Sequence, residues 1–233
     1  MRYIVLWDIP TRLSHWLLVL AVAFLFMSGV LGGGLMEWHG KIGVLVIALV
    51  AFRIVWGFLG STYARFSQFF PTPAKILAYL KGEWRGLGHN PLGALSVFAL
   101  LTLALIQALT GLFATDEISV NGPLYPLIAH DLALAVTGAH QKLAWIFCGV
   151  IALHVASIAF YKIVKKDNLL FPMLTGKKEV SPKDEDKAAR GGGWGAFVAA
   201  VFFAALAFCA ASGVWNPEPP PAPAPAVTDT PDW

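Results

Sequence analysis

The apolar residues of this chain gather into five long blocks separated by short polar segments. The blocks cover Leu13–Leu31, Gly40–Leu59, Leu92–Phe113, Ala139–Tyr161 and Gly195–Val214. Each is close to the ~20 residues that a helix needs to cross the hydrocarbon core of a bilayer. The first block is longer than the apolar region of a secretory signal peptide, and no small-residue cleavage pattern closes it. The pattern therefore predicts an all-α integral membrane protein with five transmembrane helices.

The segments between the blocks suggest how the chain is divided. Pro73–Leu80 has the pattern of a short amphipathic helix, and Thr11 is a suitable helix cap after the turn at Pro10. We expect a four-helix transmembrane domain over residues 1–178, a cytoplasmic linker over 179–193, a fifth transmembrane helix over 194–215, and a proline-rich periplasmic tail over 216–233.

The basic residues are distributed unevenly between the two sides of the predicted membrane. If the N-terminus is cytoplasmic, the inner segments hold 14 of the 17 Lys and Arg residues. Such an excess marks the cytoplasmic side, so we expect a cytoplasmic N-terminus and, after five spans, a C-terminus on the outer side. The outer segments are acidic near the bundle, at Glu37, Asp116, Glu117 and Asp131. This surface predicts a positively charged periplasmic partner, and no basic patch indicates nucleic acid.

The composition and the positions of the cysteines indicate which kinds of cofactor to expect. Of the 233 residues, 57% are hydrophobic and 13% are charged, which is typical of a membrane protein. Both cysteines, Cys148 and Cys209, fall in apolar blocks and outside any Cys-x-x-Cys or Cys-x-x-Cys-His pattern. We therefore expect neither a covalently attached c-type haem nor a disulfide.

The fourth block carries two histidines, His140 and His154, fourteen residues apart. In an α-helix this spacing puts both side chains within roughly 40° of one face and separates them by ~21 Å along the axis. An imidazole inside a membrane span is costly unless it has a partner, and it usually marks a functional site. Two haems at two depths would account for this pair, and two hydrogen-bonded histidines in a helix bundle are the alternative.

Two further histidines fall at matching depths. His39 lies at the outer end of the second block, like His140, and His15 lies at the inner end of the first block, toward His154. The four histidines thus form an outer pair and an inner pair. Two axial imidazoles saturate haem iron and favour electron transfer over catalysis at the metal. The sequence therefore predicts two haems b, with His15, His39, His140 and His154 as iron ligands.

Four basic residues stand near these pairs. Lys41 and Lys142 are suited to bind the propionates of the outer haem, and Arg53 and Arg12 those of the inner haem. For Arg53, extension of the side chain to the cytoplasmic interface is the alternative. The two remaining histidines are interpreted as a loop residue, His89, and a surface residue in the outer loop, His130, with backup ligation as the alternative for His130.

Several short motifs together resemble a known family. They are Trp7–Trp16 (WDIPTRLSHW), Trp38–Gly43 (WHGKIG), Phe52–Gly57 (FRIVWG), Gly88–Gly93 (GHNPLG) and Thr137–His140 (TGAH) with His154. From about Tyr3 to Lys178 the chain resembles the bacterial cytochrome b561 and nickel–iron hydrogenase b-type cytochrome family. The resemblance implies a four-helix dihaem bundle in the inner membrane that exchanges electrons with the quinone pool. It maps the ligands onto the same four histidines.

These observations predict a dihaem b-type cytochrome that links membrane quinone to a periplasmic redox protein, such as a c-type cytochrome or a hydrogenase. The alternative is a self-sufficient oxidoreductase that exchanges electrons between a small periplasmic substrate and quinone. A structural or transport bundle without haem is the third hypothesis. No nucleotide-phosphate loop, flavin fingerprint or catalytic triad is visible, and the sequence leaves the oligomeric state open.

Overall fold

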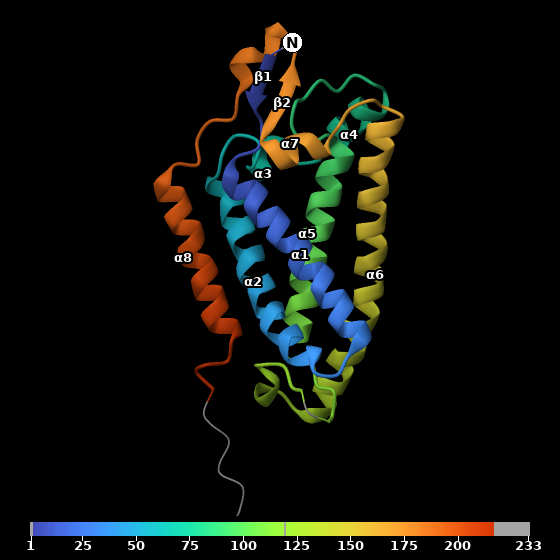
Figure 1. Ribbon diagram of the computed structural model, residues 1–233, viewed down its shortest axis with the longest axis vertical. Helices are drawn as coiled ribbons and strands as arrows, with labels where there is room; N and C mark the ends of the chain where they lie inside the picture. Colours follow the sequence, from blue (N-terminus) through green and yellow to red (C-terminus); the bar gives the residue numbers. More distant parts are fainter. Residues whose placement is uncertain (1, 119, 217–233) are drawn as a thin grey trace, which may run out of the picture.

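The computed structural model describes residues 2–118 and 120–216, and five long helices dominate it. They are α1 (Ile9–Leu31), α2 (Leu35–Leu59), α5 (Pro91–Gly111), α6 (His130–Ile163) and α8 (Trp194–Ala211). Their long axes follow the long axis of the molecule (Figure 1). All five are long and apolar enough to cross a membrane, which confirms the five predicted blocks. The chain is a multi-pass membrane protein.

The helix starts follow local capping chemistry. Helix α1 begins at Ile9, and the side chain of Asp8 accepts a hydrogen bond of 2.7 Å from the backbone N–H of Thr11. Asp8 is therefore the N-cap, and the expectation that Thr11 caps the helix is wrong. Asn90 caps α5 in the same way, and Pro91 is the first residue of that helix. Both caps satisfy N–H groups that a helix start leaves without a partner.

Helix α6 differs most from its prediction, because it begins at His130 and not near Ala139. The turn-forming residues before His140 continue the helix, and Thr137 Oγ1 donates back to the carbonyl of Ala133 at 2.8 Å. Its 34 residues span about 51 Å at 1.5 Å per residue. The helix is therefore longer than the bilayer core, and His130 lies at its N-terminus and not in a loop.

Shorter elements close the inner end of the bundle. They are α3 (Phe66–Phe69), α4 (Pro73–Leu80), α7 (Leu170–Thr175) and the 3₁₀ helix η2 (Pro182–Lys187), while a second 3₁₀ helix, η1 (Tyr125–Leu127), lies at the outer end. Helix α4 has the predicted bounds. Strand β1 (Arg2–Val5) pairs antiparallel with β2 (Lys177–Val180) beside the N-terminus (Figure 1). The sequence did not predict this pairing, which joins the start of the chain to the segment after α6.

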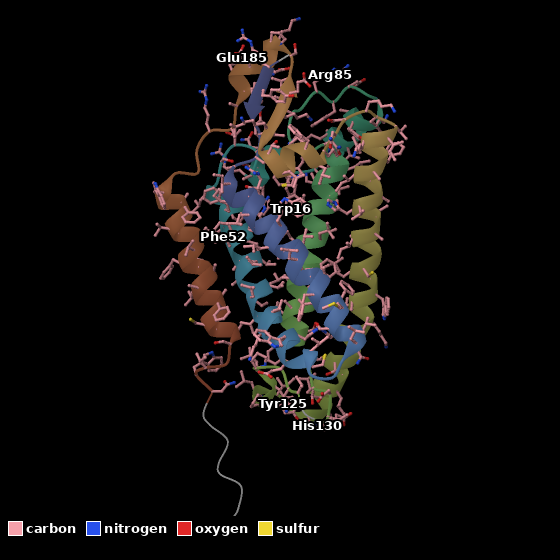
Figure 2. The ribbon with its side chains drawn as sticks, viewed as in Figure 1. Trp16, Phe52, Arg85, Tyr125, His130 and Glu185 are labelled. Atoms are coloured by element: carbon pink, nitrogen blue, oxygen red, sulfur yellow. The ribbon has the colours of Figure 1, made fainter. Side chains whose placement is uncertain are left out.

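Helix α2 is the centre of the packing, because it contacts α1, α5 and α8, while α6 packs on α5. The main apolar core lies among α1, α2, α5 and α6, with Val50 fully buried. A second cluster joins α2 to α8 through Trp56, Phe52 and Phe197, and Figure 2 labels Phe52 on this side. Helix α8 thus covers one flank of α2 and leaves the other four helices as a bundle.

Trp56 also fixes the inner end of α2 to the start of α1. Its side chain is 1% exposed, and its Nε1–H donates to the carboxylate of Asp8 at 3.1 Å and to Thr11 Oγ1 at 3.2 Å. Hydrogen bonds to a charged group in a poorly hydrated site are among the stronger ones in proteins. The contact therefore fixes the position of the first turn of α1, which precedes His15 by less than two turns.

Candidate functional site

The outer pair of histidines meets at the end of the bundle away from the β strands. The rings of His39 on α2 and His140 on α6 lie edge to face, with centroids 6.3 Å apart and planes at 76°. This is close to the roughly 6 Å expected when two imidazoles bind one metal ion at about 2 Å from each nitrogen. The structure thus brings together the two residues that the sequence placed at one depth.

A hydroxyl group of a neighbouring helix orients His39. Ser28 Oγ on α1 lies 2.9 Å from His39 Nδ1, and the same hydroxyl contacts the carbonyl of Phe24 at 2.9 Å. If the Ser28 hydroxyl donates to that carbonyl, its free lone pair accepts the Nδ1–H of His39. The lone pair of the imidazole is then on Nε2, which is the tautomer that a metal ligand needs.

The same arrangement is found at His140. Thr110 Oγ1 on α5 lies 3.0 Å from His140 Nδ1 and donates to the carbonyl of Gln107 at 2.9 Å. The side-chain amide of Gln107 contacts His140 Nε2 at 3.2 Å and donates to the His140 carbonyl at 3.0 Å. Its Oε1 is enclosed without a partner. A ligand bound at Nε2 would take the place of the Gln107 amide.

The inner pair consists of His15 on α1 and His154 on α6. Their side chains are close enough to interact electrostatically, and Arg53 lies within the same range of His15. Ser96 Oγ on α5 is 3.1 Å from His154 Nδ1. Three of the four predicted ligands therefore have a hydroxyl at Nδ1 from a different helix, which is the usual way that a metal-binding histidine is oriented.

Sequence reasoning missed Ser28, Ser96 and Thr110. The signal was present, because each is a hydroxyl residue inside an apolar block at the depth of one of the histidines. Such residues are also common in transmembrane helices where they only bond their own backbone. Without the packing of α1 and α5 against α2 and α6, the two uses look alike.

Two glycines lie directly against the outer imidazoles. A Cβ atom at Gly29 would lie 3.4 Å from His39 Cε1, and one at Gly111 would lie 3.0 Å from His140 Cε1. The helices can approach these rings closely because no side chain intervenes. No group of three or more His, Cys, Asp or Glu residues suited to a metal ion occurs in the described ranges. Two paired imidazoles without further protein ligands fit a metal that is held mainly by a porphyrin, as in haem.

The outer lysines are directed toward the surface. Lys41 Nζ bonds Glu37 at 2.6 Å and lies 4.9 Å over the ring of Trp38, and Lys142 is exposed. An exposed ion pair of this kind contributes little to stability, because solvent screens it. Lys41 can therefore exchange Glu37 for a stronger anion at little cost. The acidic surface expected at this end is neutralised in part, because Glu37 has this partner.

Arg53 is buried inside the inner half of the bundle, with 7% of its surface exposed. Its guanidinium donates to the carbonyl of Ala64 at 3.3 Å and lies 5.1 Å over the ring of Phe66. No carboxylate lies within 4.0 Å of it in the part of the chain that the structure describes. A buried guanidinium in this state calls for an anion. Arg12 donates to the Leu174 carbonyl, and its Nε is enclosed without a partner.

His89 lies in a loop, as predicted, but its imidazole is buried. It packs between Trp7 and Phe69, with ring centroids at 4.6 Å and 4.5 Å, and its Nδ1 is enclosed without a hydrogen-bond partner. Burial, together with the nearby Arg53 and the inner histidines, lowers the pKa of His89 to about 3. His89 therefore belongs to the surroundings of the inner pair.

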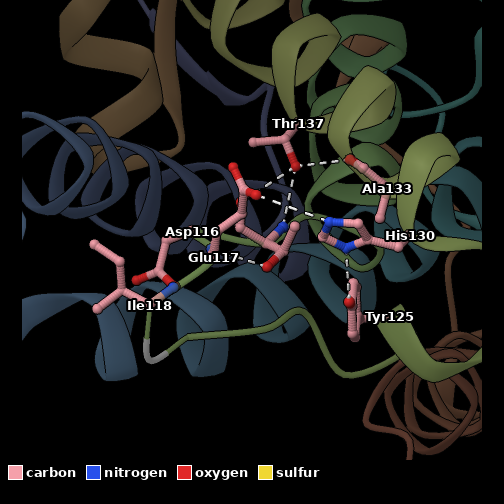
Figure 3. A network of polar contacts seen from close by, with 8 residues as sticks. Asp116, Glu117, Ile118, Tyr125, His130, Ala133 and Thr137 are labelled. Atoms are coloured by element: carbon pink, nitrogen blue, oxygen red, sulfur yellow. Dashed lines mark hydrogen bonds and ion pairs between the residues drawn. The ribbon is translucent and has the colours of Figure 1, made fainter.

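His130 remains at the surface, as predicted, although it starts α6. Figure 3 shows its ring between Tyr125 and Glu117. Its Nδ1 lies 3.1 Å from the hydroxyl of Tyr125, and its Nε2 lies 3.8 Å from the carboxylate of Glu117. Ten residues of helix separate His130 from His140, which is about 15 Å along the axis. This distance excludes His130 as a substitute for His140 in the arrangement seen here.

Comparison with known proteins finds relatives of this chain. The family described as prokaryotic cytochrome b561 matches residues 6–176. A probable Ni/Fe-hydrogenase 1 B-type cytochrome subunit of Escherichia coli K12 is 24% identical over 141 residues, which is 47% of this chain and 59% of that protein. Probable Ni/Fe-hydrogenase B-type cytochrome subunits of Rhizobium leguminosarum bv. viciae and Azotobacter chroococcum mcd 1 are 20% and 25% identical, over 77% and 73% of this chain and 90% and 86% of theirs. No solved structure matches.

Proposed function

Because the chain belongs to the prokaryotic cytochrome b561 family, we propose that it is a dihaem b-type cytochrome that carries electrons across the membrane. In this proposal His39 and His140 hold the outer haem, and His15 and His154 hold the inner haem. Haem b supplies one-electron transfer through its iron. Two axial imidazoles leave the iron no open position, so the protein acts as a conductor of electrons and not as a catalyst at the metal.

The observation that carries the proposal is the meeting of His39 and His140, whose ring centroids are 6.3 Å apart. The contacts of Ser28 and Thr110 with Nδ1 of these histidines support it, because they favour the tautomer whose lone pair is on Nε2. At His140 the iron would take the place of the Gln107 amide, which contacts Nε2 in this structure. Nδ1 of each ring contacts a hydroxyl of a neighbouring helix, and the two rings lie within the distance that one metal ion spans.

Basic residues at both depths suit the propionates. Arg53 is buried without an ion pair of its own in the described ranges, and Arg12 has an enclosed Nε without a partner. Both lie near the inner end of the bundle and would bind the inner haem. Lys41 and Lys142 would bind the outer haem after Lys41 leaves Glu37. Each contact would be a charge-assisted hydrogen bond to a carboxylate.

The proposal places the protein in the bacterial inner membrane, with its N-terminus cytoplasmic and its electrons exchanged with quinone. The relatives are named as subunits of Ni/Fe hydrogenase, which supports a hydrogenase-like enzyme as the periplasmic partner. The acidic residues Glu117 and Asp131 at the outer end also suit a c-type cytochrome with a basic surface. In either case the outer haem is the point of exchange with the partner.

Electron transfer across vesicles tests the proposal directly. The purified chain is reconstituted in lipid vesicles that contain trapped ferricyanide, and a membrane-impermeant reductant is added outside. We expect ferricyanide to be reduced at a rate proportional to the amount of protein, and vesicles without protein give the background rate. In a second experiment the vesicle membrane contains a lipid-soluble quinone and no ferricyanide is trapped. Reduction of the quinone by the external reductant then tests whether the protein exchanges electrons with quinone.

Single substitutions at the two depths make the test specific. His39→Ala and His15→Ala should each lower the rate to the background, because a wire across the membrane needs both haems. His130→Asn is the matched control, since it changes an exposed histidine at the outer end, and it should keep the rate. Equal rates in all four proteins would contradict the proposal.

A further inference from the structure

His89 is the histidine that the electron-transfer proposal leaves without a role. It comes directly before Asn90, the cap of α5, at the inner end of the bundle. The rings of Trp7 and Phe69 enclose it on two sides. Neither ring nitrogen has a hydrogen-bond partner among the residues that the structure describes, and Nδ1 is fully enclosed. A buried polar group without a partner is costly and calls for an explanation.

The surroundings of His89 are positive or neutral. The groups that act on it electrostatically are Arg53 on α2, His15 on α1 and His154 on α6. Arg53 is itself buried and makes one long hydrogen bond, to the carbonyl of Ala64. A buried guanidinium and an unpartnered imidazole therefore lie on the same side of the inner histidine pair. Their shared requirement is an anion that accepts hydrogen bonds.

From these contacts we propose that His89 binds a propionate of the inner haem, together with Arg53, and sets the potential of that haem. The inference rests on the proposed function, because it needs a haem between His15 and His154. In this role the imidazole donates one N–H to a carboxylate oxygen, and the rings of Trp7 and Phe69 fix its orientation. His89 is then a positioning residue and not an axial ligand.

The character of the site agrees with a donor role. Because burial lowers the pKa of His89 to about 3, the ring is neutral at pH 7 and carries one N–H. A neutral donor satisfies its own hydrogen-bonding need without adding another positive charge next to Arg53. A hydrogen bond to the propionate reduces the negative potential at the iron. It therefore favours the reduced haem and raises the reduction potential.

The test uses the purified full chain with its haems. His89→Phe keeps a flat ring between Trp7 and Phe69 but removes the donor, and His89→Gln keeps a donor without the ring. The His140→Ala background retains the inner haem alone and identifies its signal. Potentiometric titration then gives the oxidised-to-reduced ratio of the inner haem at a fixed applied potential, and resonance Raman spectra of the propionate groups report their hydrogen bonding.

For His89→Phe we expect the ratio to rise about ten-fold, which corresponds to a potential lower by ~59 mV for one electron. His89→Gln should restore most of the wild-type value, and the outer haem should not change in either variant. His130→Asn, the exposed control, should leave both haems as they are. The Raman change should appear in the Phe variant and be reversed in the Gln variant.

Several results would overturn the assignment. An unchanged potential in His89→Phe would make His89 a packing residue, and equal shifts in the Phe and Gln variants would indicate a general disturbance. If His89→Phe lost the inner haem, the result for His89→Gln would decide. Retention of that haem with a near wild-type potential would support the role, and loss of the haem there as well would contradict it.

His89 also borders a cavity of about 220 Å³ with Tyr63 and Lys75. A slower reaction with quinol at unchanged potential would assign His89 to that cavity instead.

Failure of the proposed function gives a different result. If the wild-type chain binds no haem, both the proposed function and the role of His89 are wrong. If the wild-type chain binds two haems and His89→Phe has no effect, only the inference about His89 fails.

Discussion

Ser28 Oγ on α1 lies 2.9 Å from His39 Nδ1 on α2. The contact connects α1 to α2 near the turn between them. The orientation of the His39 imidazole therefore depends on how these two helices pack. Thr110 makes the equivalent contact with His140 at 3.0 Å. A hydroxyl group of a neighbouring helix thus orients each histidine of the outer pair.

Replacing Ser28 by Ala should weaken the binding of the outer haem. The substitution removes the acceptor for Nδ1–H, so the His39 ring is no longer held in the tautomer that presents Nε2. Loss of such a partner typically lowers metal affinity by about 10–100-fold. The measurement is the fraction of outer haem retained during dilution in detergent. Ser157→Ala is the matched control, because among the described residues the Ser157 hydroxyl bonds only the carbonyl of Leu153 on its own helix. Equal retention in both variants would refute a role for Ser28.

The two histidine pairs should fail separately. His39→Ala or His140→Ala should remove the outer haem signal, and His15→Ala or His154→Ala the inner one, because the pairs lie about 21 Å apart along α6. Low-spin absorbance and haem content per chain distinguish the two losses. His130→Asn should keep both haems. If His130→Asn lost a haem and His140→Ala did not, the outer ligand assignment would be wrong.

Most of the fold could be predicted from the sequence, because membrane helices are set by long apolar blocks that the structure reproduces. The bounds of α6 could not, since Thr137 and Gly138 resemble a turn in the sequence. In the structure Thr137 bonds the carbonyl of Ala133 and continues the helix. The β1–β2 pair was also missed. A strand of four residues has too little pattern to be recognised, and its partner lies about 175 residues further along the chain.

The site could be predicted only as far as spacing allows. The fourteen-residue interval of His140 and His154 and the matching depths of His39 and His15 follow from helix geometry. The positions of His89 and Lys41 do not. His89 is enclosed by Trp7 and Phe69, which come from distant segments, and Lys41 has a local partner one helical turn away in Glu37.

Trp56→Phe should destabilise the protein by about 1.5–3 kcal/mol, the usual range for hydrogen bonds to a charged group. The new ring keeps the packing against Phe52 and Phe197, but it cannot donate to the carboxylate of Asp8. Denaturant unfolding in detergent micelles gives the free energy. Trp194→Phe is the control, because Trp194 is exposed and its change should cost far less. Equal free energies for the two variants would show that the contact with Asp8 contributes little.

The outer end should attract a basic redox partner through Glu117 and Asp131. Electron exchange with a basic c-type cytochrome should slow as ionic strength rises from about 10 mM to 500 mM, because the screening length falls from ~30 Å to a few Å. Glu117→Gln with Asp131→Asn should reduce that dependence. Asp116 is left unchanged because it accepts hydrogen bonds from Ile118 and Val120 and shapes the loop. A rate that ignores salt in both proteins would indicate apolar docking.

Five crossings should place the two ends of the chain on opposite sides of the membrane. A phosphatase fused after Trp233, which lies outside the described residues, should be active in the periplasm, and a fluorescent protein fused there should be dark. The bias of basic residues toward the inner segments gives the direction. A fusion within the linker, after Lys187, should give the opposite pattern and serves as the control. An inactive phosphatase at the C-terminus would mean that α8 does not cross.

We propose that this chain holds two haems b, each bound between two histidines. The most direct measurement is the haem-to-protein ratio of the purified chain, with reduced-minus-oxidised spectra and the pyridine haemochrome of the extracted pigment. We predict two acid–acetone-extractable b-type haems per chain, both low-spin and six-coordinate. One haem per chain would mean that either the inner or the outer histidine pair does not bind haem. A chain that is pure, folded and free of haem, or one whose haem is high-spin, would contradict it.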